Sequence, residues 1–334
     1  MGMNKELPGP DDEQTNKRMH TSLAGSMIAT PSLLRTPRIS VIVIGFNMAR
    51  ELPRTIRSLS PLMQRGIDAA DYEVILIDNG STKRFDEAGL RRWIPDLVVH
   101  RMENATPSPV PAINRGIEMA RADLVGVCID GARMASPGLL AAALAASRRH
   151  PRPIIGTIAF HLGPDRQMRS IQNGYDQAAE DALLASIGWE EDGYRLFEIS
   201  ALAGSSERGW FETPAESNAV FMKAGHWREL GGFDPGFVLA GGGLANLDLW
   251  ERACADDSAL LIMLLGEATF HQVHGGVATN SPVSKWDLFE SEYIRLRGRP
   301  YQRPSRRPTF FGSLPESVRK VATTPSVATS NRST

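Results

Sequence analysis

An alternation of short apolar runs and helical patterns between residues 38 and 150 constrains the fold of this chain most strongly. Each apolar run is followed by a segment with apolar residues at helical spacing, and the runs are RISVIVIGF, EVILID, DLVVHRM and DLVGVCID. This order predicts an α/β fold with a mostly parallel, twisted sheet and helices on both faces. Ligands of such sheets bind beyond the carboxyl ends of the strands, so residues at those ends are the first candidates for a site.

The second half of the chain continues this pattern less regularly. We expect a helix near residues 175–187, strands at LLIML and ATFHQVH, and a last helix at WDLFESEYIRLRG. No linker intervenes, so the second half is predicted to be a lid or an acceptor region built onto the same sheet. A further helix is expected over residues 50–63, where Leu52, Ile56, Leu59 and Met63 have helical spacing.

The predicted organisation is one domain between two tails. The domain covers residues 38–300, with a half over 38–150 that carries the candidate ligand-binding strand ends and an acceptor half over 151–300. Residues 1–37 have little apolar periodicity, and residues 301–334 are rich in Ser, Thr, Arg and Pro. Both ends are therefore expected to be flexible.

Composition and short motifs exclude several classes of protein. The 37 Lys and Arg balance 38 Asp and Glu, so no basic field recruits nucleic acid. The two cysteines, Cys128 and Cys254, give neither a disulfide framework nor metal-ligand spacing. No apolar run reaches the ~18 residues of a membrane helix, and no secretory signal pattern opens the chain, so a cytoplasmic location is expected. GFNMAR after the first strand lacks the glycine patterns of NAD enzymes and P-loop NTPases.

Polar and aromatic residues stand at the ends of three predicted strands. Phe46 follows the first strand, Asp78 and Asn79 end the second, and Asp130 ends the fourth. Together they offer a flat face for a base, hydrogen-bonding groups for its edge and an acceptor for ribose hydroxyls. Taken singly, each has another interpretation, since Asp78 also begins an ordinary turn and Phe46 could belong to the core.

An ordered set of segments resembles the family 2 glycosyltransferases, which are nucleotide-sugar enzymes of GT-A fold. The segments, spread over residues 38–275, are ISVIVIGFN, ELPRTIRSL, EVILIDNGST, AINRGIEMARADLVGVCIDGARM, ELGGFDPGF and GGGLANLDLWERA. The resemblance implies transfer of a sugar of hexose type from a nucleotide-diphosphate donor. The acceptor would be a hydroxyl group of a glycan, a lipid-linked molecule or a small molecule, and inversion is the family's default.

The same resemblance assigns residues to the donor and to a divalent metal, Mn²⁺ or Mg²⁺. Donor-binding residues would be Phe46, Asn47, Glu51, Asp78, Asn79, Asn114, Asp130 and Arg133. Asp130 matches the first acid of the family's D-x-D motif, which holds ribose and metal. Gly131 and Ala132 stand where the second acid is usual, so metal dependence is left open. Arg133 offers a guanidinium that could neutralise a diphosphate instead.

Two histidines in FHQVHGG are candidates for the metal or the diphosphate. If the segment is extended, residues three apart point to opposite faces, so only one imidazole is expected to enter the site. His274 is chosen over His271, because it adjoins the glycines and because relatives often carry such a histidine there. The predicted metal ligands are therefore Asp130 and His274.

The catalytic base is the least defined part of the site. Relatives supply it from an acidic stretch after a Gly-rich loop, but here Ala245 and Asn246 occupy those positions. One interpretation gives the role to Asp248 or Glu216, with Asp234 as a lesser candidate. A second is a retaining mechanism without such a base, and a third is a catalytically impaired module that binds nucleotide sugars or glycans.

Aromatic and basic residues suggest contacts with the acceptor. Trp210 and Phe211 could form a platform for a sugar ring, or belong to the core. Arginines between residues 295 and 307 could touch an anionic lipid or a phosphorylated acceptor, or form a solvated tail. Membrane contact is thus expected to be peripheral at most.

Overall fold

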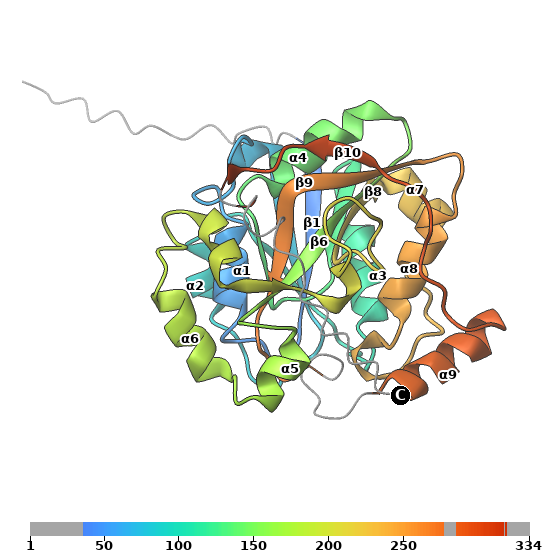
Figure 1. The fold of residues 1–334 in the computed structure, drawn as a ribbon. Coiled ribbons are helices and arrows are strands. Elements are labelled where there is room, and N and C mark those ends of the chain that lie inside the picture. The colour runs from blue at the N-terminus through green and yellow to red at the C-terminus, as the bar shows by residue number, and fades with distance from the viewer. Residues whose placement is uncertain (1–35, 277–284, 317, 319–334) are drawn as a thin grey trace, which may run out of the picture. The chain divides into compact units, whose positions relative to one another are not determined.

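The computed structural model describes residues 36–276, 285–316 and 318 of the chain. The predicted tail over residues 1–37 therefore lies, except for its last two residues, outside the described residues. Residues 36 onward form one unit, whose helices and strands are shown in Figure 1.

Parallel strands and their helices make up the first half, as predicted. The strands are β1 (Ile39–Gly45), β2 (Tyr72–Asp78), β3 (Val98–Arg101) and β4 (Leu124–Cys128), and the helices are α1 (Leu52–Ser58), α2 (Glu87–Arg91), α3 (Val110–Met119) and α4 (Leu139–Ala146). β1 pairs in parallel with both β2 and β4, and β2 with β3. Helix α1 is shorter than the expected 50–63, because Pro61 disfavours helical geometry at Ser60.

The second half extends the same sheet beyond β4, with both parallel and antiparallel pairs. The short strand β5 (Arg133–Ala135) still belongs to the first half, and the strands after it are β6 (Pro153–Leu162), β7 (Ser200–Leu202), β8 (Ala219–Lys223), β9 (Leu260–His271) and β10 (Thr309–Gly312). The main order is β10-β9-β6-β8-β4-β1-β2-β3, with β8 antiparallel to β4 and β6, and β5 and β7 paired to β9 and β6. The sheet is thus mixed, and it contains strands from both halves of the chain.

Helices of the second half flank these strands. They are α5 (Gln167–Gln172), α6 (Gln177–Ala185), α7 (Ala224–Glu229), α8 (Ala245–Cys254) and α9 (Trp286–Arg297). Short 3-10 turns cover Ala69–Asp71, Ser147–Arg149, Gly193–Ile199, Gly204–Ser206 and Ala240–Gly242.

Both faces of the sheet are buried, as the alternation along β1 requires. Val41 and Val43 pack in one apolar cluster with residues of α1, α2 and α4, whereas Ile42 and Ile44 pack in another with residues of α3 and α8. In Figure 1, α1 and α2 accordingly lie on one side of the strands, and α3 and α8 on the other.

Two predictions about the second half were wrong. LLIML and ATFHQVH do not form separate strands, because β9 runs unbroken from Leu260 to His271 with Gly266 at a φ of 81° inside it. Residues 301–312 are not the start of a flexible tail, since β10 pairs in parallel with the edge of β9. The rest of that predicted tail, residues 319–334, lies outside the described part of the chain.

Candidate functional site

The ends of β1, β2 and β4 meet at one edge of the sheet. Their register aligns Gly45 with Asp78. The backbone N–H of Asn79 donates to the carbonyl of Gly45 at 2.8 Å, and that of Gly131 donates to the carbonyl of Ile44 at 2.7 Å. The loops that carry Phe46, Asp78 and Asp130 are therefore tied together, and the Phe46 ring is 51% exposed there.

Asp130 begins a tight turn that leaves no room for a second acid. Its Oδ1 accepts from the backbone N–H of Ala132 at 2.8 Å. A Cβ on Gly131 would lie 2.8 Å from the carbonyl oxygen of Ile44, and Ala132 is fully buried. Neither position can hold a carboxylate without movement of the backbone, which gives a steric reason for the missing acid.

Two imidazoles face the other oxygen of Asp130. Its Oδ2 lies 2.9 Å from Nε2 of His271 and 3.3 Å from Nε2 of His274. The prediction that only one of these histidines could enter the site was wrong. Strand β9 ends at His271, so the alternation of a strand no longer applies to His274 three residues on.

A glutamine sets the orientation of His271. Nδ1 of His271 lies 2.6 Å from Oε1 of Gln167 on α5. When Nδ1–H donates to that oxygen, Nε2 presents a lone pair to Asp130 and His274. Either a proton on His274 or a cation between the three groups can offset the repulsion of these lone pairs.

These three side chains fit a divalent metal. Their ligand atoms all lie within 4.8 Å of one another, and they form the one such group of His, Cys, Asp and Glu found among the residues that the structure describes. One carboxylate oxygen and two imidazole nitrogens are donors that Mn²⁺ accepts, whereas Mg²⁺ prefers oxygen ligands throughout.

The electrostatics of the three residues are coupled. Burial opposes ionisation of Asp130, but the charges of His274 and His271 outweigh it and hold the pKa of this carboxyl well below its usual range. Burial, with Arg133 nearby, lowers the pKa of His271 to about 4. Although burial also acts on His274, the charge of Asp130 raises the pKa of that imidazole. The site thus favours a negative Asp130 and a neutral His271.

Arg133 brings a buried positive charge beside this cluster. It lies on β5, in register with His271 on β9, and only 7% of it is exposed. Its Nε and Nη1 are buried without a hydrogen-bond partner among the described residues. Burial lowers its pKa, while the charges of Asp130 and Glu216 act in the opposite direction. An unpaired guanidinium in this place suits an anionic ligand.

Glu216 enters the same region from the loop before β8. Strand β8 pairs with β4, and the backbone N–H of Ile129 donates to the carbonyl of Asn218 at 3.3 Å, so this loop runs beside Asp130. Glu216 is half-buried. Its Oε2 accepts from Nδ2 of Asn246 at 2.6 Å.

Asp248 has a different environment from Glu216. It is 1% exposed, and each of its oxygens accepts from an arginine: Oδ2 from Nε of Arg252 at 2.8 Å and Oδ1 from Nε of Arg297 at 2.5 Å. The pair with Arg297 joins α8 to α9, whereas the pair with Arg252 lies within α8. Asp234 also pairs with Arg297, at 2.7 Å. Both carboxylates are therefore engaged by arginines, and Asp248 has no open oxygen to offer an acceptor.

The residues predicted at the base and ribose mostly shape their own loops. Asp78 is fully buried, accepting from the backbone N–H of Ser81 at 2.8 Å and pairing with Nη1 of Arg101 at 2.7 Å. Asn79 donates to the carbonyl of Thr106 at 3.0 Å. The Oδ1 of Asn47 accepts from the backbone N–H groups of residues 82 and 83. Phe46 and the partly exposed Arg101 are therefore the open side chains of this edge.

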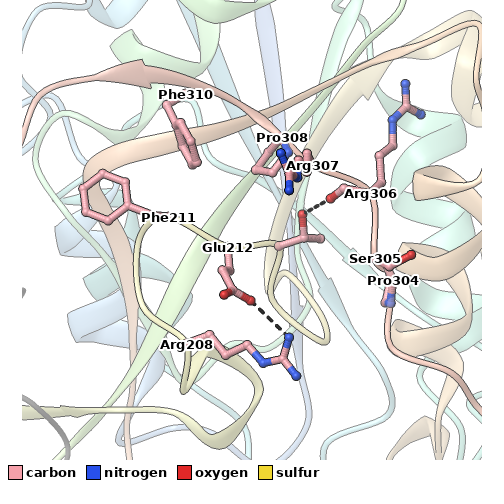
Figure 2. A pocket seen from close by; sticks show the side chains of 10 residues that line it. Arg208, Phe211, Glu212, Pro304, Ser305, Arg306, Arg307, Pro308 and Phe310 are labelled. Atoms are coloured by element: carbon pink, nitrogen blue, oxygen red, sulfur yellow. Dashed lines mark hydrogen bonds and ion pairs between the residues drawn. The ribbon is translucent and has the colours of Figure 1, made fainter.

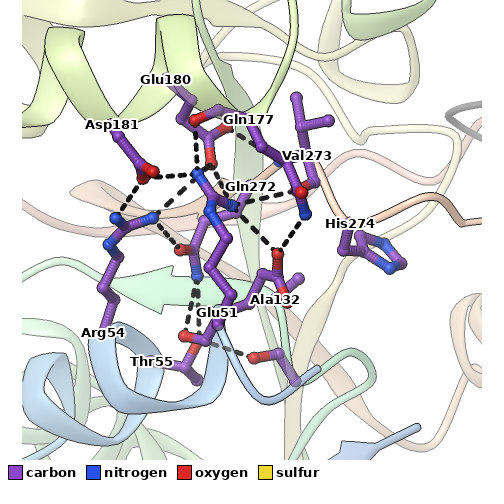
Figure 3. A network of polar contacts seen from close by, with 12 residues as sticks. Glu51, Arg54, Thr55, Ala132, Gln177, Glu180, Asp181, Gln272, Val273 and His274 are labelled. Carbon is purple, nitrogen blue, oxygen red and sulfur yellow. Dashed lines mark hydrogen bonds and ion pairs between the residues drawn. The ribbon is translucent and has the colours of Figure 1, made fainter. Parts of the chain in front are cut away.

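Glu51 and Asn114 do not reach the open edge either. Glu51 is 2% exposed and accepts from Nη1 of Arg50 and Nε2 of Gln177, inside the network of Figure 3. Nδ2 of Asn114 on α3 donates to the carbonyl of Phe233, and Oδ1 of Asn114 accepts from the backbone N–H of Phe233. Both were predicted to bind the donor, and both instead fix neighbouring segments in place.

Sequence reasoning missed His271 and Arg101. Arg101 ends β3 in register with Asp78, so applying the strand-end rule to the third strand would have found it. For His271 the signal was its position in FHQVHGG, which was read as one extended run.

Comparison with known proteins identifies the family. The model of Glycosyl transferase family 2 matches residues 40–203. Residues 40–203, just under half of the chain, thus form a glycosyl transferase family 2 domain, which confirms the predicted resemblance. The layered α/β architecture expected for a family 2 domain is thus confirmed. No curated protein sequence matches the chain.

Solved structures of S. aureus TarS are similar to this chain. TarS 1–349 gives a TM-score of 0.47 at 12% identity, over 70% of this chain and 60% of that one. Its complex with UDP-GlcNAc gives 0.49 at 14% identity, over 77% and 66%, and TarS itself gives 0.49 at 13%, over 71% and 37%. The chain thus spans less than two thirds of each of these structures. Within its own described residues, no helix combines the length and apolar character needed to cross a membrane.

Proposed function

We propose that this chain is a glycosyltransferase that moves a hexose from a nucleoside-diphosphate donor to a hydroxyl group of an acceptor, with inversion. One observation carries the proposal: Asp130, His271 and His274 gather beside Arg133, whose Nε and Nη1 have no hydrogen-bond partner among the described residues, at the edge where β1, β2 and β4 end. A diphosphate requires this concentration of positive charge when it leaves the sugar. The family match over residues 40–203 supports the donor class.

The proposed cation ligands are Asp130, His271 and His274, with Mn²⁺ favoured by their mixed donors. When bound, such an ion neutralises charge on the diphosphate. Arg133 adds a second positive charge that is built into the chain. Phe46 offers its exposed ring to the base, and Arg101 its guanidinium to the nucleotide.

Glu216 is the base in this proposal, in place of Asp248. Asn246 donates to Oε2 of Glu216, and Oε1 accepts no hydrogen bond from the described residues. That oxygen can take the proton of the acceptor hydroxyl as it attacks the anomeric carbon. The amide at 246 stands where relatives carry an acid, and here it would orient an acid supplied by the neighbouring loop.

A module that binds nucleotide sugars without turnover is the second candidate. The observation that favours it is the loss of carboxylates at positions 131, 132 and 246. The two candidates differ in one respect, which is whether a bound donor is consumed.

Nucleotide release from a panel of UDP-, GDP- and dTDP-hexoses, with and without Mn²⁺, tests the proposal. We expect release by the native chain, and none by Asp130→Ala. Glu216→Gln should bind the donor normally but turn it over roughly 10²–10⁴-fold more slowly, whereas the exposed Glu198→Gln should behave as the native chain. Tight donor binding without release by the native chain would establish the module instead.

Binding of Mn²⁺ alone gives a second readout. Electron paramagnetic resonance should show bound Mn²⁺ in the native chain and much weaker binding in His271→Ala and His274→Ala. The surface variant His150→Ala is the matched control. Equal Mn²⁺ binding in all of these proteins would remove the metal from the proposal.

A further inference from the structure

A hollow of about 490 Å³ lies outside the cluster around Asp130. It is formed by residues 208–213 and by residues 304–310, which lead into β10 (Figure 2). We call it the 211–310 pocket after its two aromatic residues, Phe211 and Phe310. Nothing in the proposed donor chemistry uses it.

Two phenyl rings form one wall of the pocket. Phe211 is 60% exposed and Phe310 is 38% exposed. Their ring centroids are 5.7 Å apart and the rings meet edge to face at 78°. Neighbouring exposed aromatic rings beside polar residues mark a candidate ligand-binding surface. Sugar rings are one such ligand, because their apolar C–H faces pack on aromatic surfaces.

Charged side chains form the rest of the wall, with a positive excess. The lining includes Arg208, Arg306 and Arg307 against Glu212, which is three positive charges and one negative. Arg208 pairs with Glu212 at 3.1 Å, and Arg306 donates to backbone carbonyls of residues 254, 256 and 259. Arg307 is exposed and has no ion-pair partner among the described residues. It is therefore available to an anion.

The pocket is connected to the proposed base by a short, braced loop. Phe211 and Glu216 are five residues apart, so their Cα atoms lie within about 18 Å at 3.3–3.6 Å per residue. Thr213 donates to the carbonyl of Arg306, and Tyr301 donates to the carbonyl of Ala215, each at 2.5 Å. A glycan chain that lies in the pocket can thus extend toward Glu216.

We propose that the 211–310 pocket binds an acidic stretch of the acceptor, made of sugar rings that carry carboxylate or phosphate groups. The rings pack on Phe211 and Phe310, and Arg307 pairs with the acidic group. Charge complementarity selects this occupant over a neutral glycan. The inference rests on the proposed transferase function, for which it names the acceptor class.

Calorimetric titration of the full chain with defined glycans tests this proposal. The probes are tetragalacturonate, a phosphorylated maltotetraose and maltotetraose itself. We expect at least one acidic probe to bind about tenfold more tightly than neutral maltotetraose. The acidic probe that binds more tightly shows whether the pocket prefers carboxylate or phosphate groups. Phe211→Ala and Arg307→Ala should each weaken this binding about tenfold.

Matched controls are Leu62→Ala and Arg115→Ala, which remove an exposed apolar side chain and an exposed cation elsewhere. They should bind the acidic probe as the native chain does. Equal affinity for acidic and neutral probes, unchanged affinity in Phe211→Ala and Arg307→Ala, or no binding at all would overturn the proposal. Dimerisation that depends on Phe211 would also overturn it, because the occupant would then be a second copy of the chain.

Donor hydrolysis without acceptor separates this inference from the proposed function. Phe211→Ala and Arg307→Ala should release nucleotide as fast as the native chain, since neither residue belongs to the donor site. If the donor is consumed but binding of acidic glycans does not depend on Phe211 and Arg307, the pocket proposal alone fails. If acidic glycans depend on the pocket but no donor is consumed, the transferase function fails and the pocket remains a glycan site.

Discussion

At the scale of single residues, the acid that closes β4 is explained by its neighbours in space. Asp130 lacks an acidic companion in the sequence because the turn behind it is sterically closed. Its partners come from β9 and the residue segment after it, as the imidazoles of His271 and His274. In the proposed metal site, two imidazoles and one carboxylate would stand in place of the family's usual pair of carboxylates, and such a donor set favours Mn²⁺ over Mg²⁺.

Restoring the usual acid at position 131 should damage the fold and add no ligand. In Gly131→Asp the new Cβ would lie 2.8 Å from the Ile44 carbonyl oxygen and 3.0 Å from the Leu52 side chain. Forced overpacking of this kind costs about 1–3 kcal/mol. Urea unfolding should show that loss, while Gly225→Ala, where the nearest atom is 4.0 Å away, should not. Native stability with tighter Mn²⁺ binding would contradict the steric explanation.

Gln167 should control metal affinity without touching the metal. Its carbonyl oxygen fixes which nitrogen of His271 carries the proton, so Gln167→Leu leaves the imidazole free to present Nε2–H to the site. We expect Mn²⁺ affinity to fall roughly 10–100-fold, as measured by electron paramagnetic resonance. Gln172→Leu, an exposed change on the same helix, is the control. Equal affinities in the two variants would mean that the hydrogen bond has no influence on the ligand.

At the scale of helices and strands, α6 holds the segment that carries His274. Glu180 on α6 is fully buried, accepts from the backbone N–H of Val273 at 2.8 Å and pairs with Arg50 at 3.2 Å. Arg50 also donates to the carbonyl of Val273. The position of His274 therefore depends on a carboxylate from another element.

Glu180 should make stability depend on pH. Burial raises its pKa from 4.5 to about 7, although Val273 and Arg50 oppose the shift. The folded state then binds this proton more tightly than the unfolded state, so the free energy of unfolding falls as pH rises from about 4.5 to about 7. The effect reaches at most about 3 kcal/mol, at 1.36 kcal/mol per pKa unit.

Glu180→Gln should flatten this part of the pH profile. Urea unfolding at pH 5 and pH 7.5 measures the difference in free energy between the two conditions for each protein. The native chain and Glu118→Gln, an exposed change on α3, should lose more stability with rising pH than Glu180→Gln does. Parallel profiles for all three would show that Glu180 does not titrate in this range.

The elements that could be predicted are those with local signals. The first four strands and their helices follow from apolar periodicity and β-branched runs, and α9 follows from its own pattern. β10 could not be predicted, because TFFG lies in a stretch of Arg, Pro and Ser and becomes a strand only through pairing with β9. The same distinction applies to the site. The strand-end rule predicted Asp130 from a local signal. The entry of both His271 and His274 could not be predicted, because it depends on a turn of the chain after β9 that has no periodic signal.

At the scale of the whole molecule, the site depends on both halves of the chain. Asp130 and Arg133 come from the first half, and Glu216, His271 and His274 from the second. They meet because β8 and β9 pair beside the strands of the first half in one sheet. The family match over residues 40–203 therefore ends before the residues that complete the proposed chemistry.

Residues 299–316 cover the edge of this sheet and hold the loop that carries Glu216, which we call the base loop. Their removal should therefore affect both stability and turnover. β10 covers the edge of β9, Arg306 donates to carbonyls after α8, and Tyr301 holds the carbonyl of Ala215. A chain ending at residue 298 would expose the edge of β9, and unpaired edges promote association between chains.

We expect that truncated chain to melt at a lower temperature, by roughly 2–4 °C for each kcal/mol lost, and to aggregate in light scattering. A chain ending at residue 318 keeps β10 and the bonds of Arg306 and Tyr301, so it is the matched control. Donor turnover should fall more than donor binding in the shorter chain, because Glu216 loses its brace while Asp130 and the histidines keep theirs. If both truncations melt and turn over alike, residues 299–316 are dispensable for the sheet and for the base loop.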